Sequence, residues 1–232
     1  TQTELTTELI AEGIDIHFED NIDLIPAGIN QENTLVIYTP AIPKDHTELN
    51  YFFDQNFNVM KRSEVLGEIT KHTYNIGVAG THGKTTTSSI LGHILKVADL
   101  ECTAFLGGIA ENYNSNIISN GSKYTVAEAD EFDRSFLRLS PKLAIITSDD
   151  ADHLDIYGER EEVKKSFQEF AQIVEEKLFV HKGLPFENAS TYGVNLNADY
   201  DAHNVRIIDG HYVFDVTTPN GTLKDVGILL PG

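Results

Sequence analysis

The sequence has little of what marks a secreted, membrane-spanning or leader-bearing protein. Its 232 residues include one cysteine, Cys102, so no intrachain disulfide can form and a disulfide-stapled secreted fold is excluded. No apolar run approaches the roughly 20 residues that a membrane-spanning helix needs. The first eleven residues contain no Lys or Arg, so nothing there has the pattern of a signal peptide. We therefore expect a cytoplasmic protein without a membrane partner.

Basic residues are also scarce, with 17 Lys and Arg against 36 Asp and Glu and a formal net charge of −19. Such a surface repels a polyphosphate backbone, which argues against nucleic-acid binding. A phosphate ligand would need local help from backbone N–H groups, one well-placed lysine and a divalent cation. The rest of the composition, 41% hydrophobic and 23% charged, is ordinary for a globular protein with a sizeable core.

Apolar and polar residues alternate in a way that predicts a βαβ rhythm and therefore an α/β fold with a parallel sheet. Gly13 is predicted to cap the end of the first helix, and Ser63 to cap the start of the third. The predicted helices span residues 3–12, 46–55, 64–70, 86–98 and 161–174. The predicted strands span residues 14–18, 35–38, 58–60, 75–79, 103–106, 124–127 and 143–147. The tail predicts a small antiparallel element, with a hairpin of 205–208 and 212–216 and a last strand at 226–230.

A glycine loop, Gly80-Thr81-His82-Gly83-Lys84-Thr85-Thr86, follows the strand at 75–79 and opens the next helix. The glycines let successive N–H groups converge on an anion, Lys84 would reach the β- and γ-phosphates of ATP, and the Thr85 hydroxyl would hold Mg²⁺. The complete phosphate-loop pattern has a glycine where Val78 stands, so the loop is a shortened variant. The alternative is a chance glycine turn, against which the Gly-Lys-Thr-Thr-Thr run argues.

Acidic residues follow the predicted strand at 124–127. Strand alternation puts Glu128 and Asp130 on one face and Glu131 on the other, and one of these carboxylates could bind magnesium. A solvated acidic turn is the alternative.

A histidine follows the predicted strand at 143–147 in a similar way. His153 could ligate a metal or orient a phosphate, held by Asp152 or Asp155, although a lone loop histidine usually has no such role. Because the carboxyl ends of parallel strands share one sheet edge, these groups should face the glycine loop.

In this order, Gly80-Thr-His-Gly-Lys-Thr-Thr-Thr87, Glu128-Ala-Asp-Glu131 and Asp152-His153-Leu-Asp155 resemble the Mur ligases of bacterial cell-wall synthesis, most of all their alanine-adding branch. The resemblance covers nearly the whole chain and is specific only in combination. It implies an incomplete Rossmann-like, UDP-sugar-binding domain at residues 1–71 and a central ATP-binding domain at 72–232, with the C-terminal amino-acid-binding domain absent. Such a stretch should bind nucleotide weakly and lack turnover by itself.

The resemblance also implies roles for individual residues. Lys84, Glu128 and His153 would be catalytic, and Thr85, Glu128 and His153 would hold Mg²⁺. The nucleotide would lie on the loop, at Gly80, Thr81, His82, Gly83, Lys84, Thr85 and Thr86. Thr39, Arg62 and His82 would lie on the side of the sugar substrate.

The implied reaction joins L-alanine to UDP-N-acetylmuramate in an ATP- and Mg²⁺-dependent ligation through an acyl phosphate. The implied partners are these small molecules, with the protein a monomer or a weak homodimer. A recycling ligase that adds a tripeptide to the same sugar shares the motifs and stays open. So do a regulatory nucleotide-binding module without ligase chemistry and a structural or metal-storage domain without affinity for ATP.

Overall fold

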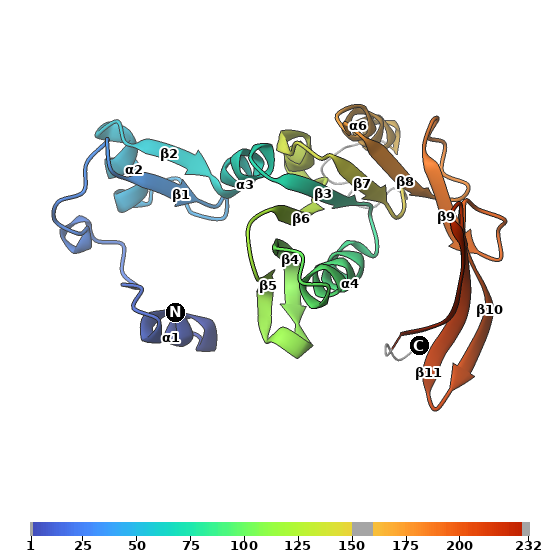
Figure 1. Ribbon diagram of the computed structural model, residues 1–232. Coiled ribbons are helices and arrows are strands. Elements are labelled where there is room, and N and C mark those ends of the chain that lie inside the picture. Colours follow the sequence, from blue (N-terminus) through green and yellow to red (C-terminus); the bar gives the residue numbers. More distant parts are fainter. Residues whose placement is uncertain (1, 150–159, 229–232) are drawn as a thin grey trace. The chain divides into compact units, whose positions relative to one another are not determined.

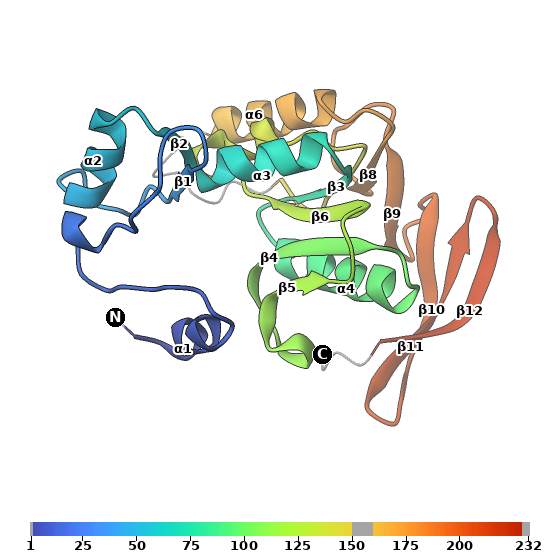
Figure 2. The same cartoon turned by 60° about the vertical axis from the view of Figure 1, so that its left-hand side comes forward.

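The computed structural model describes residues 2–149 and 160–228 and divides into two compact units, Thr1–Val65 and Leu66–Gly232. We call them the N-terminal and the C-terminal unit; Figures 1 and 2 show their elements. The division falls within helix α3 (Arg62–Lys71), and the predicted domain boundary between residues 71 and 72 lies at the end of the same helix.

The N-terminal unit is built around one βαβ motif. Its elements are α1 (Glu4–Ala11), the 3-10 helix η1 (Ile22–Leu24), β1 (Leu35–Tyr38), α2 (Thr47–Asp54) and β2 (Asn58–Lys61). Strands β1 and β2 pair in parallel, with Leu35 opposite Asn58 and Tyr38 opposite Lys61. The parallel pairing predicted from the alternating strands and helices is confirmed here.

The strand predicted at residues 14–18 is wrong, since this segment follows α1 without regular structure. Gly13, with φ 95°, ends α1 as predicted, and its N–H donates to the Ile10 carbonyl at 3.0 Å. The N–H of Ile14 donates to the Leu9 carbonyl at 3.0 Å, which completes a Schellman motif. The residue that would begin the strand therefore serves to close the helix.

The cap predicted at Ser63 is also wrong, because α3 already begins at Arg62 and includes that serine. Glu64 takes over part of the capping role. Its carboxylate accepts a hydrogen bond at 2.7 Å from the N–H of Lys61, just before the helix. A first-turn glutamate that reaches back in this way satisfies a backbone donor that the helix itself leaves open.

The described part of the C-terminal unit forms a ten-stranded sheet in the order β12-β11-β10-β9-β8-β7-β3-β6-β4-β5. The strands are β3 (Tyr74–Ala79), β4 (Cys102–Ala110), β5 (Ser115–Ser119), β6 (Tyr124–Ala129), β7 (Leu143–Ile146), β8 (Lys177–His181), β9 (Ser190–Val194), β10 (Tyr200–Ile208), β11 (His211–Thr218) and β12 (Gly221–Ile228). The helical elements are α4 (Lys84–Val97), η2 (Glu111–Tyr113), η3 (Phe132–Arg138) and α6 (Arg160–Gln172).

From β4 to β10 the neighbouring strands of this sheet are parallel, while β5, β11 and β12 join antiparallel. The α/β class with a parallel sheet and a small antiparallel element is therefore confirmed. Asp209 and Gly210, with φ 51° and 79°, make the predicted hairpin turn between β10 and β11. The sequence did not predict β5, β8 and β9, and of the last predicted strand, residues 229–230 lie outside the described residues.

Helices cover both faces of the central part of the sheet. Because successive residues of a strand point to opposite sides, each central strand contributes to both cores. Ala79 of β3 packs in one core with Phe167 and Phe170 of α6, whereas Val78 belongs to a second core with Leu91 of α4. Figure 1 shows α6 above the sheet and α4 below it. This three-layer arrangement fixes the carboxyl ends of β3, β6 and β7 side by side.

Candidate active site

The glycine loop connects β3 to α4 as the sequence predicts. Gly80 has a φ of 131° and Gly83 a φ of 80°, values that favour glycine because a Cβ atom is strained there. The helix begins at Lys84 and not at Thr86, so the predicted start is two residues late. Lys84 and Thr85 therefore belong to the first turn of α4, next to the backbone N–H groups that an anion would meet.

The start of α4 fits an anionic ligand. Gly83 is the N-cap and brings no side chain to this end of the helix. The first helical hydrogen bond runs from the N–H of Thr87 to the carbonyl of Gly83, at 3.0 Å. The N–H groups of the three preceding residues therefore point outward from the helix start, where the helix dipole also favours negative charge.

Two residues that directly follow β7 hold the loop in shape. The Thr147 hydroxyl donates to the carbonyl of Ala79 at 3.1 Å and also to the carbonyl of His82. Ser148 Oγ accepts a hydrogen bond from the His82 N–H at 2.9 Å and lies 2.8 Å from Thr81 Oγ1. The sequence did not place Thr147 or Ser148 in the site, although both belong to the polar stretch after an apolar strand.

Lys84 is held within the site rather than extended into solvent. Its Nζ donates to the carbonyl of Gly80 at 2.7 Å and lies 2.9 and 3.1 Å from the two carboxylate oxygens of Glu131. The Glu131 side chain is fully buried and that of Lys84 is 16% exposed. Sequence reasoning counted Glu131 only among the carboxylates that could bind magnesium, since nothing local shows that it meets Lys84.

Glu128 and Thr85, the two expected magnesium ligands within the described residues, lie together. Glu128 Oε2 accepts a hydrogen bond at 3.1 Å from the Thr85 hydroxyl, and Oε1 accepts one at 2.6 Å from the Gly107 N–H. The parallel register of β3 and β6 brings this about, because Val78 pairs with Glu128 just before the loop begins. A hydroxyl and a carboxylate are oxygen ligands of the kind that Mg²⁺ takes.

His153, the third expected metal ligand, and its neighbours Asp152 and Asp155 lie outside the described residues. Among the side chains that the structure describes, no three of His, Cys, Asp or Glu gather as a metal centre. The side chain of His82 is exposed at the surface of the loop. The structure thus brings Lys84, Thr85 and Glu128 together around the start of α4.

The two remaining predicted residues belong to the N-terminal unit. Thr39 directly follows the last residue of β1, and Arg62 directly follows the last residue of β2. Because Tyr38 and Lys61 pair in the parallel register, Thr39 and Arg62 come at neighbouring positions of one sheet edge. That edge is the carboxyl end of both strands, where α/β sheets bind their ligands.

The fold and the glycine loop place the chain in one class of proteins. These are α/β proteins in which a glycine loop and a helix N-terminus lie at the carboxyl edge of a parallel sheet. Residues 78–232 match the Mur ligase middle domain, and residues 1–74 match a domain described as Mur ligase family, catalytic domain. The chain therefore belongs to the Mur ligase family.

UDP-N-acetylmuramate–L-alanine ligase of Flavobacterium johnsoniae is 59% identical over 234 residues, covering 100% of this chain and 52% of that protein. The chain thus spans about half the length of the curated relatives it matches. Among solved structures, UDP-N-acetylmuramate-alanine ligase of Thermotoga maritima has a TM-score of 0.81 at 24% identity, covering 100% of this chain and 54% of that one. UDP-N-acetylmuramate:L-alanyl-gamma-D-glutamyl-meso-diaminopimelate ligase of Neisseria meningitides has a TM-score of 0.80 at 21% identity, covering 100% and 78%. These two likenesses concern the fold.

No helix among residues 2–149 and 160–228 is both long enough and apolar enough to cross a bilayer.

Proposed function

We propose that the chain forms the sugar-side and ATP-side parts of a ligase that joins L-alanine to UDP-N-acetylmuramate through an acyl phosphate. One observation carries the proposal: Lys84 and Thr85 lie in the first turn of α4, whose start has no side-chain cap, and Glu128 accepts a hydrogen bond from Thr85 there. The 59% identity to an alanine-adding ligase over the whole chain supports the choice of amino acid. It favours L-alanine over the tripeptide of the recycling branch.

The residues present fit MgATP. The loop from Gly80 to Thr86 would receive the phosphates through backbone N–H groups and Lys84, while the Thr85 hydroxyl would face one magnesium ion. Glu128, with His153 as its expected partner, would face a second. When bound, ATP supplies the phosphoryl group that activates the sugar's carboxylate, and magnesium draws negative charge from the phosphoryl oxygens.

The chain's own contribution is positional and electrostatic. Lys84 and the first-turn N–H groups of α4 stabilise negative charge where it accumulates, without having to reorganise during the reaction. Glu128 keeps the Thr85 hydroxyl and the Gly107 backbone in a fixed relation through hydrogen bonds of 3.1 and 2.6 Å. Fixed positions of this kind convert binding energy into the orientation of the reacting groups.

For the sugar nucleotide we propose the N-terminal unit, with Thr39 and Arg62 as contacts at the carboxyl ends of β1 and β2. A guanidinium suits a diphosphate, to which it donates in a planar, bidentate way. His82, exposed on the loop of the C-terminal unit, is proposed separately as a contact of the substrate. The His82 carbonyl accepts a hydrogen bond from Thr147 and its N–H donates one to Ser148. These bonds fix the position of the His82 backbone, from which the imidazole extends.

Phosphate release by the full-length gene product tests the reaction. With MgATP and UDP-N-acetylmuramate present, we expect release with L-alanine and little with the tripeptide. Preference for the tripeptide would establish the recycling activity instead. Release that responds to neither amine would favour the regulatory nucleotide-binding module.

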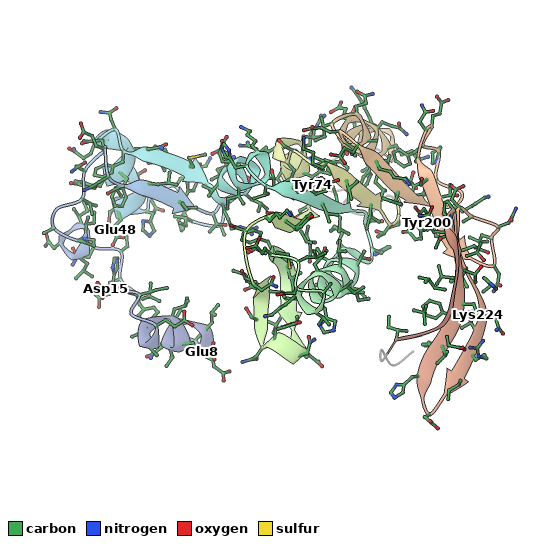
Figure 3. All side chains as sticks on the ribbon, in the orientation of Figure 1. Glu8, Asp15, Glu48, Tyr74, Tyr200 and Lys224 are labelled. Atoms are coloured by element: carbon green, nitrogen blue, oxygen red, sulfur yellow. The ribbon has the colours of Figure 1, made fainter. Side chains whose placement is uncertain are left out.

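Nucleotide binding by the chain itself tests the site directly. MgADP should bind the Lys84→Ala variant at least tenfold more weakly than wild type. The same is expected of Thr85→Val, a substitution at an exposed position. Lys224→Ala removes the same charge from an exposed position on β12 and should bind as wild type does (Figure 3). Unchanged affinity in both loop variants would contradict the proposal. The cytoplasmic location and the monomer or weak dimer expected from the sequence stay predictions.

A further inference from the structure

The carboxylate of Glu131 is fully buried beside the phosphate loop, and the ligase mechanism proposed above does not use it. An ionised carboxylate is costly to bury unless an opposite charge and hydrogen bonds compensate for the lost water. Lys84 compensates it, with Nζ at 2.9 and 3.1 Å from the two oxygens. The protein therefore places a fixed negative charge at the ammonium that is expected to receive the nucleotide phosphates.

The position of Glu131 is rigid because the core of the C-terminal unit anchors it. Glu131 opens η3, and its carbonyl accepts a hydrogen bond at 3.0 Å from the Arg134 N–H. Further along the same helix, η3, Phe136 is 1% exposed. Its ring stacks on that of Phe170 of α6, with centroids 5.0 Å apart and planes 7° apart. A shift of the Glu131 backbone would disturb this packing, so Lys84 has to adapt to Glu131.

Lys84 has three N–H donors to distribute. The Gly80 carbonyl, at 2.7 Å, takes one, and the Glu131 carboxylate takes part of the rest. Phosphates arriving at the start of α4 would compete with Glu131 for the same ammonium, and the buried carboxylate would also repel their charge.

We propose that Glu131 is a positioning residue that tethers Lys84 and weakens its grip on the bound nucleotide. Because Glu131 holds Lys84, the ammonium attracts the phosphates of the bound ground state less strongly. A larger part of its attraction then acts in the transition state, when charge develops on the transferred phosphoryl group. The inference rests on the proposed nucleotide-binding function of the loop. It assigns to Glu131 a role in rate and affinity that neither the sequence nor the family match supplies.

Titration of MgADP into Glu131→Gln tests the tether. The amide keeps the size of the side chain and removes its charge, so we expect MgADP to bind about tenfold more tightly than to wild type. Glu187→Gln, which removes the same charge from an exposed position of the same unit, should bind as wild type does. Equal or weaker binding by Glu131→Gln would overturn the tether while leaving the nucleotide site intact. Binding by neither wild type nor variants would instead overturn the proposed function, and the tether with it.

Steady-state kinetics of the full-length product separate positioning from a structural role. In Glu131→Gln we expect kcat to fall at least tenfold while KM for ATP also falls, because ground-state binding improves at the expense of the transition state. Loss of folded enzyme would lower kcat and leave KM unchanged. An unchanged kcat and KM, or a lower kcat with an unchanged KM, would therefore overturn the proposal.

A third measurement needs no change at position 131. In ¹⁵N-lysine-labelled wild-type chain without nucleotide, the Lys84 ammonium should give a slowly exchanging NMR signal, assigned by its loss in Lys84→Ala. MgADP should leave that signal protected, because the proposed tether persists in the complex. Rapid exchange in the free chain would show that Glu131 does not hold Lys84 and would overturn the proposal.

Discussion

A Cβ atom added to Gly80 would lie 2.1 Å from Thr147 Oγ1. It would therefore overlap the hydroxyl that donates hydrogen bonds to the carbonyls of Ala79 and His82. It would also lie 2.9 Å from the backbone nitrogen of Ser148, and the φ of 131° at Gly80 is one that other residues rarely adopt. Close approach and backbone conformation therefore both require glycine here. The loop can pack this tightly onto the end of β7 only without a side chain.

Gly80→Ala should destabilise the C-terminal unit by roughly 2–4 kcal/mol and abolish measurable nucleotide binding, because strand end and loop must separate. Urea unfolding gives the free energy, and MgADP titration gives the affinity. Gly227→Ala is the matched control, since a Cβ atom there meets nothing within 4 Å. A Gly80→Ala protein as stable as this control would contradict the packing described here.

Ser148→Ala should weaken nucleotide binding more than it weakens the fold. The change removes the Oγ contacts to Thr81 Oγ1 at 2.8 Å and to the His82 N–H at 2.9 Å. We expect a loss of about 1–2 kcal/mol in the free energy of unfolding, with a lower affinity for MgADP. Ser119→Ala is the control: it removes a comparable 2.8 Å contact between Ser119 Oγ of β5 and Thr103 Oγ1 of β4, and it should leave the affinity for MgADP unchanged. Equal affinity in the two variants would show that Ser148 does not shape the loop.

The ion pair of Lys84 and Glu131 should matter for stability as well as for binding. Lys84→Ala leaves the buried Glu131 carboxylate without its nearest charge partner and should cost about 3–5 kcal/mol. The double variant Lys84→Met with Glu131→Leu should recover most of that loss, because an apolar pair carries no buried charge. Urea unfolding of both proteins gives the comparison. As a control, Glu169→Ala breaks an exposed pair with Arg134 and should cost at most about 1 kcal/mol.

Asp20 should titrate well below an ordinary aspartate. Its carboxylate accepts hydrogen bonds from the Thr47 N–H at 2.8 Å and the Glu48 N–H at 3.0 Å, at the start of α2 (Figure 3 labels Glu48). These bonds, that from Thr47 first, lower the pKa of Asp20 from 3.8 to about 2. Because the folded-state pKa is depressed, Asp20 stabilises the N-terminal unit above about pH 4, and this contribution is lost as the pH falls through about 2.

The amide NMR signals of Thr47 and Glu48 should therefore move with a midpoint near pH 2. In Asp20→Asn the titration should disappear, and stability should depend less on pH between about 4 and 2. Asp15→Asn removes the same charge from an exposed position and should leave both amide titrations in place. A midpoint near pH 4 in wild type would show that Asp20 does not cap α2 in solution.

Local patterns were sufficient for much of the fold. The strand at 75–79, the glycine loop and the following helix could be predicted because each has its own sequence pattern within a few residues. The predicted start of the helix was only two residues late. The errors come where a local signal competes with a neighbour. Residues 14–18 alternate as a strand would, but Ile14 closes the Schellman motif of α1. Strands β5, β8 and β9 were not predicted, although each has five residues and the predicted strands β1, β2 and β7 have only four, so length does not explain the omission.

In the candidate site too, local patterns predicted some contacts between residues and missed others. Glu128 and the loop could be associated in advance, because both follow strands whose carboxyl ends meet at one sheet edge. Glu131 beside Lys84, and Ser148 beside Thr81, could not. These pairs are 47 and 67 residues apart in the chain, and no local pattern connects them.

By itself, then, the sequence determined which chemical groups are present: a loop with a phosphate-binding pattern and acidic side chains at strand ends. It also determined that basic side chains are too few to bind polyanions elsewhere. Only the tertiary structure decided which of these groups touch. The strand order β7-β3-β6 sets Thr147 and Ser148 on one side of the loop and Glu128 and Glu131 on the other. That order depends on how the two apolar faces of β3 pack against α4 and α6, a long-range balance that short stretches of sequence do not contain.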